Sequence, residues 1–252
     1  MKNTRRILCA GIPRSGSTWM YNIIRLMLLR SGAEVYGAWI EDYQPETQAD
    51  WHVVKVHEPL DESWLEKAEL IFCSHRDLRD IAVSSIRMGW AKENEEVLFL
   101  LEKIVNMHHF WSSHAAFELH YEDLLDDPAR VASAIAGVLG MTLDGDAIRQ
   151  LCQKVDALNN NGKAEHDPVT LLHPDHRQSG RYGRYRTELP ASLTQQIELQ
   201  FGPWLIEHGY LELSSWMQAI TKAYRFLYQE NLGLKTRIHE LEKVMRKHTQ
   251  EP

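Results

Sequence analysis

The chain has 252 residues, 44% of them hydrophobic, so it can bury one substantial core and is not a small disulfide-stapled protein. Its 35 acidic and 28 basic residues give a net charge of −7, which argues against a nucleic acid partner held through the phosphate backbone. The N-terminal apolar run is too short for a signal peptide, no run approaches the roughly twenty apolar residues of a membrane span, and an odd number of cysteines favours a reduced, cytoplasmic setting.

The first predicted elements are a buried strand at 7–10 and an amphipathic helix, joined by the loop Gly11 to Thr18. The loop has the spacing GxxxxG followed by Ser17 and Thr18, as in phosphate-binding P-loops. Gly11 and Gly16 allow backbone geometry closed to other residues, and the two hydroxyl side chains can cap the helix. Free amides at the start of that helix, aided by its dipole, form a site for an anion.

This loop departs from the P-loop at one position, because Ser17 stands where the lysine belongs. A P-loop NTPase uses that lysine on the outer phosphates, so the loop is poorly equipped for metal-assisted phosphoryl transfer. Its cation is Arg14 instead. Two alternative functions stay open for a protein with this loop: a P-loop nucleotide or small-molecule kinase, and a non-catalytic nucleotide-binding dimer.

The next segment, 33–52, shows no clear period and is expected to be a loop-rich excursion. A short strand at 53–56 then delivers Lys55, His57 and Glu58 to the sheet edge where ligands usually bind. A catalytic base is well placed there.

A second phosphate signal follows a predicted buried strand at 70–73. The sequence SHRDLRDIAVSS places Arg76 at the strand exit and Ser84 eight residues on, about two helical turns, so both can face one point. Arginine offers a planar fork to a phosphate, and serine adds a short donor. The alternative is a surface helix with solvated ion pairs.

The helix predicted at 91–111 is rich in histidine and aromatic residues. Its adjacent histidines, His108 and His109, point to different helix faces, and no cysteine or carboxylate completes a zinc spacing, so no metal is expected. Tryptophans in the segments 33–52 and 86–111 can wall a pocket that suits sugars or aromatic alcohols equally well.

A fourth strand is predicted at 117–121, followed by a helix at 128–140. From 156 to 189 the sequence loses its period, and connections of this length are usually lids or binding segments. The run QSGRYGRYR, at 178–186, is basic within an acidic protein and predicts a lid over an anion.

The C-terminal segment, 211–252, changes to a heptad pattern that predicts a coiled-coil seam. The seam positions are Met217, Ile220, Tyr224, Leu227, Asn231, Leu234, Ile238, Leu241 and Met245. The core asparagine favours a parallel homodimer through 217–245, and charges flanking the seam would face opposite charges of a second chain. These pairs are Glu230 with Lys235 and Arg237 with Glu242. The alternative is a single helix folded onto its own domain.

Together these motifs resemble those of sulfotransferases that use PAPS (3'-phosphoadenosine 5'-phosphosulfate). The PRSGST loop resembles the 5'-phosphosulfate-binding motif of the family, with Arg14 where many cytosolic members carry lysine and several bacterial members carry arginine. The segment KVHEPL looks like the KTHLP segment, which implies that His57 takes the proton of the acceptor and that Lys55 approaches the sulfonate. Glu58 is the runner-up base, since some Golgi-type relatives use a glutamate. The resemblance places the whole loop in the cofactor site: Arg14, Ser15, Gly16, Ser17, Thr18 and Trp19.

The 3'-phosphate motif of the family, RNPxDxxVS, matches from Arg76 to Ser84, with Asp77 and Leu78 in place of its Asn-Pro. The resemblance implies that Arg76 and Ser84 bind the 3'-phosphate, while Asp80 positions the turn.

Two further segments resemble family motifs. Tyr121 begins a YEDL segment whose tyrosine lies near the adenine in the family. The lid matches RKGxxGDWK loosely: if its first glycine is Gly180, a glutamine and Ser179 replace the Arg-Lys pair. We therefore assign Ser179, Gly180 and Arg181 to the cofactor site, and leave open whether Arg177 or Arg181 clamps the 3'-phosphate.

The sequence predicts a three-layer α/β, P-loop-like domain with a central, mostly parallel sheet over 1–210, and a helical coiled-coil dimerisation tail over 211–252. The resemblance implies transfer of a sulfonate from PAPS to a hydroxyl of a carbohydrate, lipid or small alcohol, leaving adenosine 3',5'-bisphosphate (PAP). No metal is expected for this chemistry, because the sulfuryl group carries less charge than a phosphoryl group and cationic side chains can suffice.

Overall fold

A computed structural model describes residues 4–160, 166–173 and 181–248, with side chains of the last helix described only in part up to Arg237. The chain divides into two compact units, Met1–Leu189 and Pro190–Pro252, each described by itself below.

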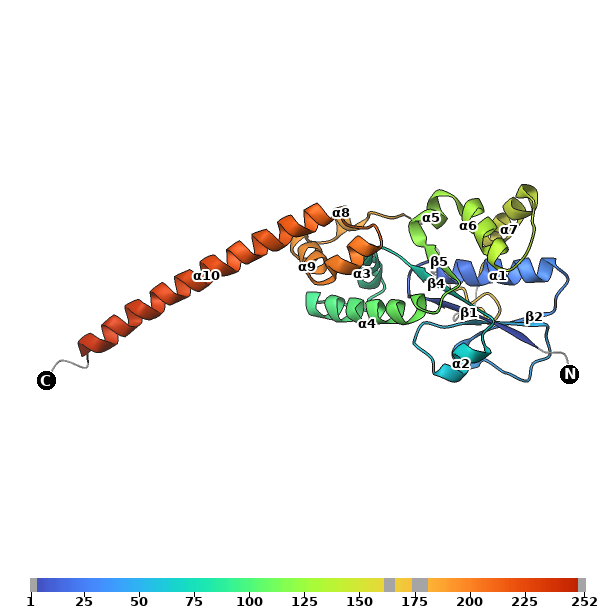
Figure 1. The fold of residues 1–252 in the computed structure, drawn as a ribbon, viewed down its shortest axis with the longest axis horizontal. Coiled ribbons are helices and arrows are strands. Elements are labelled where there is room, and N and C mark those ends of the chain that lie inside the picture. The colour runs from blue at the N-terminus through green and yellow to red at the C-terminus, as the bar shows by residue number, and fades with distance from the viewer. Residues whose placement is uncertain (1–3, 161–165, 174–180, 249–252) are drawn as a thin grey trace. The chain divides into compact units, whose positions relative to one another are not determined.

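The first unit is built on a five-stranded sheet in which every pair of neighbours is parallel. The strands are β1 Arg5–Gly11, β2 Val35–Trp39, β3 Trp51–Lys55, β4 Leu70–His75 and β5 Phe117–His120. They lie in the order β2-β3-β1-β4-β5 (Figure 1). Because β1 is central, its carboxyl end at Gly11 lies between the ends of β3 and β4, where the candidate site residues follow the strands.

Helices cover both faces of this sheet (Figure 1). In the first unit they are α1 Ser17–Arg30, α2 Glu62–Lys67, α3 Leu78–Arg87, α4 Asn94–Ser112, α5 Tyr121–Asp126, α6 Pro128–Val138, α7 Gly145–Ala157 and α8 Tyr185–Glu188, with a 3₁₀ turn, η1, at Ile40–Asp42. Alternate strand residues supply two separate cores: Ile7 and Cys9 pack with α1, α6 and α7, whereas Leu8 and Ala10 pack with Trp111 of α4 and with α2. Burial on both faces explains the continuous apolar runs of the strands. The predicted three-layer α/β fold is confirmed.

The structure corrects two local predictions. The segment 33–52, predicted to be loop-rich, contains the edge strand β2. Gly37 interrupts the strand pattern of this segment in the sequence. A Cβ at this position would lie 2.4 Å from the Tyr21 hydroxyl of α1, so only glycine fits. The predicted cap of α1 is also wrong, because Gly16 is the N-cap residue and no side chain accepts a bond there.

The second unit consists of two helices, α9 Ala191–Glu207 and α10 Leu213–His248. Gly202 of α9 lies against the indole of Trp216, since a Cβ on Gly202 would come within 1.9 Å of that ring's nitrogen. Helix α10 is continuous over 36 residues, as the heptad pattern predicts. Seam residues exposed on it are Met217, Tyr224, Leu227 and Leu234.

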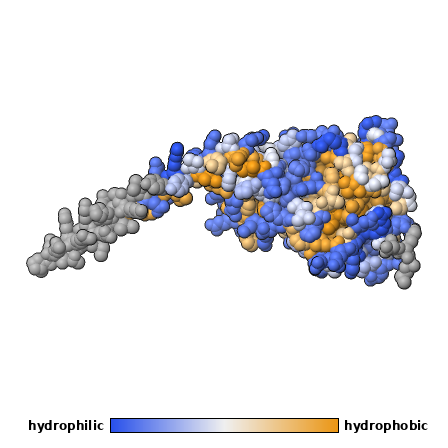
Figure 2. All heavy atoms as spheres, in the orientation of Figure 1, coloured by the Kyte–Doolittle hydropathy of each residue, from blue (hydrophilic) through white to orange (hydrophobic). Residues whose placement is uncertain are grey.

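Two surface observations complete the description. Hydrophilic residues are interspersed with hydrophobic ones over the viewed face (Figure 2), and none of the described helices is long and apolar enough to cross a membrane. The three cysteines, Cys9, Cys73 and Cys152, are all buried as free thiols.

Candidate active site

A cavity of about 810 Å³ opens at the carboxyl edge of the sheet. The PRSGST loop, the end of β3, helix α3, the start of α5 and the segment 181–184 all contribute to its wall. Predicted site residues on the wall are Arg14, Gly16, Ser17, Thr18, Trp19, Lys55, His57, Arg76, Ser84, Tyr121 and Arg181. Motifs spread over more than 160 residues of chain therefore meet in one cavity.

The PRSGST loop turns sharply so that its backbone can approach a ligand. Gly16 has φ of 84° and Arg14 has φ of 66°, both in the left-handed region that non-glycine residues rarely adopt. A Cβ on Gly11 would lie 1.9 Å from the Ser74 hydroxyl, so this position also requires glycine. Beneath the loop, the Ser15 hydroxyl donates to the Ile12 carbonyl at 2.6 Å. Strain held in this way is typical of a binding loop.

Arg14 connects the PRSGST loop to helix α3. Its Nε donates to the Ser84 hydroxyl of α3 at 2.8 Å. Burial, followed by the charge of Arg76, lowers the pKa of Arg14. Arg76 pairs with Asp80 at 3.5 Å, so two guanidinium groups share a partly buried space with this one carboxylate beside them. An anion would stabilise this arrangement.

Lys55 and His57 lie together at the end of β3. The Lys55 Nζ donates to His57 Nε2 at 3.5 Å, and His57 Nδ1 donates to the Gly11 carbonyl. Because that carbonyl can only accept, the proton of a neutral ring lies on Nδ1, and the lone pair on Nε2 faces the lysine. The backbone is also fixed, since the Trp111 indole donates to the His57 carbonyl at 2.8 Å. This arrangement suits a general base.

Lys55 is almost fully buried, at 6% exposure, with its Nζ 5.0 Å from the ring centre of Trp39. Burial lowers the pKa of Lys55 to about 8, and Arg14 adds to the shift. Above pH 8 such a lysine is mostly neutral. Below pH 8 it carries a charge that is poorly hydrated, and an incoming anion can pair with that charge.

The other end of the cavity is built around Arg76. Its guanidinium lies 4.2 Å from the ring centre of Tyr121, and its Nη2 donates to the Arg181 carbonyl at 2.9 Å. Asp80, one turn along, accepts from the backbone amides of Gly183 at 2.6 Å and Tyr185 at 3.0 Å. Arg76 and Asp80 therefore hold the segment 181–185 in place.

Two predicted residues within the described part of the chain do not line the cavity. Ser15 is fully buried below the loop, and Glu58 is exposed and does not line the cavity. Ser179 and Gly180 lie outside the described residues, as does Arg177. Among the described arginines of 181–186, Arg181 and Arg184 line the cavity.

Sequence reasoning missed several wall residues, among them Asp156, Leu172 and His173. Arg184, also on the wall, belongs to the run 178–186 that predicts a basic lid. Burial, then the nearby His166, Lys55 and Arg14, lower the pKa of His173, which keeps it neutral beside the cations. The tryptophan-rich segments gave a partial signal, since Trp90 is on the wall. His173 lies in the aperiodic loop, where no pattern identifies it.

Comparison with known families decides between the readings of this cavity. A model of the sulfotransferase domain matches residues 4–205, which is most of the chain. The chain belongs to the sulfotransferase family. This sulfotransferase has no match among curated protein sequences. The P-loop kinase alternative thereby loses its support.

Solved structures show the same fold. A retinol dehydratase in complex with androsterone and inactive cofactor PAP has a TM-score of 0.61 at 18% identity and covers 81% of each chain. A mouse sulfotransferase, SULT7A1, complexed with PAP has a TM-score of 0.63 at 14% identity and covers 89% of this chain and 90% of its own. Retinol dehydratase with retinol and PAP gives 0.59 at 20% identity, covering 81% and 82%.

Proposed function

We propose that this sulfotransferase takes its sulfonate from PAPS and transfers it to an acceptor hydroxyl, releasing PAP. The observation that carries the proposal is the meeting of Arg14, Arg76 and the Lys55–His57 pair in one cavity. PAPS carries one phosphate at the 3' position of its ribose and the phosphosulfate at the 5' position, and the cavity offers cations at two ends. The neighbours crystallised with PAP support the same donor.

In the proposed mechanism, Nε2 of His57 takes the proton from the acceptor hydroxyl, whose oxygen attacks sulfur in line with the bridging oxygen. The S–O bond to the phosphate breaks, and the leaving group keeps the electron pair. Lys55, Arg14 and the amides at the start of α1 stabilise the charge that develops on the sulfonate and the leaving phosphate. Glu58 is exposed, which favours His57 over it as the base.

The nucleoside is held by the other end of the cavity. Arg76 and Ser84 bind the 3'-phosphate, and Tyr121, already under the guanidinium of Arg76, packs near the adenine. Arg181 adds charge from the lid, since its side chain is on the cavity wall and its carbonyl is fixed by Arg76. Arg14, Ser17, Thr18 and Trp19 surround the 5'-phosphosulfate.

A binding experiment tests the donor before any acceptor is known. Thermal unfolding of the full chain is followed with PAP, and separately with ATP and magnesium. We expect PAP to raise the melting temperature and ATP–magnesium to leave it unchanged. Stabilisation by ATP–magnesium alone would contradict the proposal. A screen of carbohydrate, lipid and small alcohol acceptors with sulfur-labelled PAPS then identifies the acceptor class.

For the second unit, we propose a parallel homodimer through α10. Four apolar seam residues are more than half exposed on a continuous helix, with Met217 at 52% and Tyr224 at 68%. The flanking charges are complementary between two parallel copies, with Glu230 facing Lys235. Analytical ultracentrifugation should give a dimer that becomes a monomer in Leu227→Glu/Leu234→Glu. A wild type that stays monomeric at every concentration would overturn it.

We further propose that the sulfotransferase domain extends to residue 210 and that the protein works in the cytoplasm. Three buried free thiols support a reducing compartment.

A further inference from the structure

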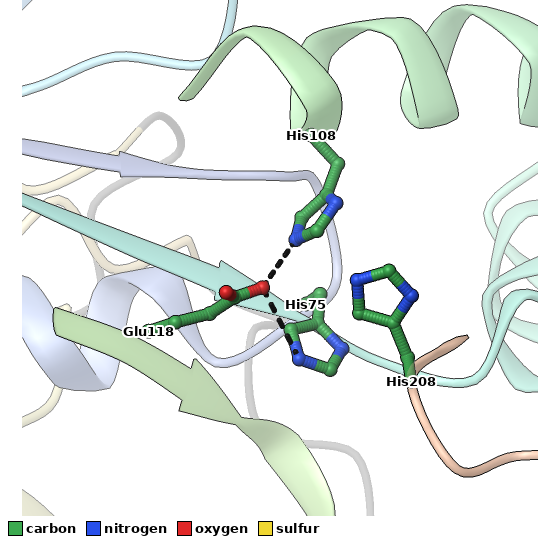
Figure 3. Close-up of side chains that lie close together, drawn as sticks. All are labelled: His75, His108, Glu118 and His208. Atoms are coloured by element: carbon green, nitrogen blue, oxygen red, sulfur yellow. Dashed lines mark hydrogen bonds and ion pairs between the residues drawn. The ribbon is translucent and has the colours of Figure 1, made fainter. Parts of the chain in front are cut away.

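A cluster of two histidines and a carboxylate lies in the first unit, away from the cavity. His75 ends β4, Glu118 lies on β5, and His108 lies on α4, so three elements each contribute one side chain (Figure 3). None of the three lines the cavity. Figure 3 also draws His208, a residue of the second unit, which the proposal below does not include.

The parallel pairing of β4 with β5 brings His75 and Glu118 together. Cys73 pairs with Glu118, and His75 pairs with His120, so side chains at these positions share one face of the sheet. The second core, with Trp111 of α4, covers that same face. His108, one turn before Trp111, therefore lies over the ends of both strands.

The donor atoms converge on one point. His108 Nε2 lies 2.5 Å from Oε1 of Glu118, and His75 Nε2 lies 3.3 Å from the same oxygen. The three atoms are all within 4.8 Å of one another. Both histidines are fully buried, while the Glu118 side chain is 32% exposed, so the cluster is enclosed yet has a path to solvent.

This donor set is one that zinc uses. Two imidazole nitrogens and a carboxylate oxygen form known zinc sites, in which water can take the fourth position. With metal–ligand bonds near 2.1 Å, ligand atoms in a tetrahedral site lie about 3.4 Å apart. The His75–Glu118 separation already fits, and the His108–Glu118 hydrogen bond would open by about 1 Å as the metal replaces its proton.

We propose that His75, His108 and Glu118 bind a zinc ion that ties α4 to β4 and β5. The ion is separate from the transfer chemistry, for which the cavity supplies cationic side chains. Sequence spacing does not reveal the site, because its ligands lie 33 and 10 residues apart on three elements.

The test uses the full-length protein and zinc chloride as the probe. Metal content after purification is measured by mass spectrometry, and chelator-treated protein is then titrated by calorimetry. We expect one zinc per chain and a rise in melting temperature of about 5 to 10 °C at free zinc about a hundredfold above its dissociation constant. Magnesium chloride should give no shift, since magnesium prefers oxygen ligands. Protein without metal and without a zinc shift would show a hydrogen-bonded cluster only, and would overturn the proposal.

Variants locate the ion. Glu118→Gln and His108→Gln should each lose the bound zinc and the shift, while His109→Gln, at the adjacent exposed position, should keep both. Zinc retained by the first two variants would place the ion elsewhere and overturn the assignment. PAP binding, measured on every variant, checks folding. Its failure in the wild type would count against the donor proposal alone.

Discussion

The two ends of the cavity work with different kinds of charge. At one end, Lys55 and His57 share a contact in which protons can be gained or lost, and burial brings the pKa of the lysine to about 8. At the other, the planar guanidinium of Arg76 is fixed by Tyr121 and by the carbonyl of Arg181. The first end should therefore govern turnover, and the second should govern how tightly the nucleotide is held.

The largest effect is expected at the first end. His57→Ala should lower kcat about 10³-fold, because it removes the proposed general base, while the affinity for PAP stays within about twofold. Labelled sulfonate transfer and calorimetry measure the two. The matched control is Glu58→Gln, at the adjacent exposed carboxylate. If Glu58→Gln loses turnover and His57→Ala does not, the base is Glu58.

At the second end, Arg76→Ala should weaken PAP binding about 100-fold. It removes charged hydrogen bonds to the 3'-phosphate and releases the Arg181 carbonyl. Calorimetry on Arg87→Ala serves as the control, since Arg87 ends the helix α3 that follows Arg76 and pairs with Glu188 at 2.8 Å. Equal losses in both variants would show a general effect of charge.

A smaller change should follow from loosening the lid. Asp80→Asn leaves one oxygen to accept from two amides, Gly183 and Tyr185, so we expect PAP to dissociate about tenfold faster with little change in kcat. Stopped-flow displacement measures the rate. Tyr182→Phe is the control, since it removes a lid contact with Asp126 at the surface. Unchanged dissociation in Asp80→Asn would separate the lid from nucleotide release.

The smallest effect concerns pH. Below pH 8 Lys55 is charged and can pair with the sulfonate, and above it the charge is lost, so its contribution falls as pH rises. Between pH 7.5 and 8.5 the protonated fraction drops about threefold. Lys55→Arg keeps a charge over this range, so the ratio of wild-type to variant kcat should fall about threefold. A constant ratio would contradict a titrating Lys55.

The same two ends differ in how far sequence could predict them. The PRSGST loop and the KVHE segment are each a short continuous stretch that follows a strand with a clear apolar run. Local pattern therefore predicts that Gly11, Gly16, Lys55 and His57 lie at the carboxyl edge of the sheet. The sheet and its helices followed from the same periodicity. The fold is confirmed, because a strand buried on both faces of a sheet must be apolar along its whole length, which makes it visible in the sequence.

What sequence could not provide is contact between distant segments. Asp80 bonds to Gly183 across 103 positions, and no spacing rule predicts such a pair. His173 lies in an aperiodic loop for the same reason. β2 was missed because it is an edge strand, half-buried, whose glycine is set by the side chains of α1.

The contact between Lys55 and His57 has a consequence for the order in which the two substrates act. The Nε2 lone pair that would take a proton from the acceptor already accepts from the lysine, and one lone pair cannot serve two hydrogens. Under the proposed mechanism, His57 becomes available as a base when the lysine turns toward the negative sulfonate of the bound donor. The acceptor hydroxyl should therefore be deprotonated only after the donor has bound.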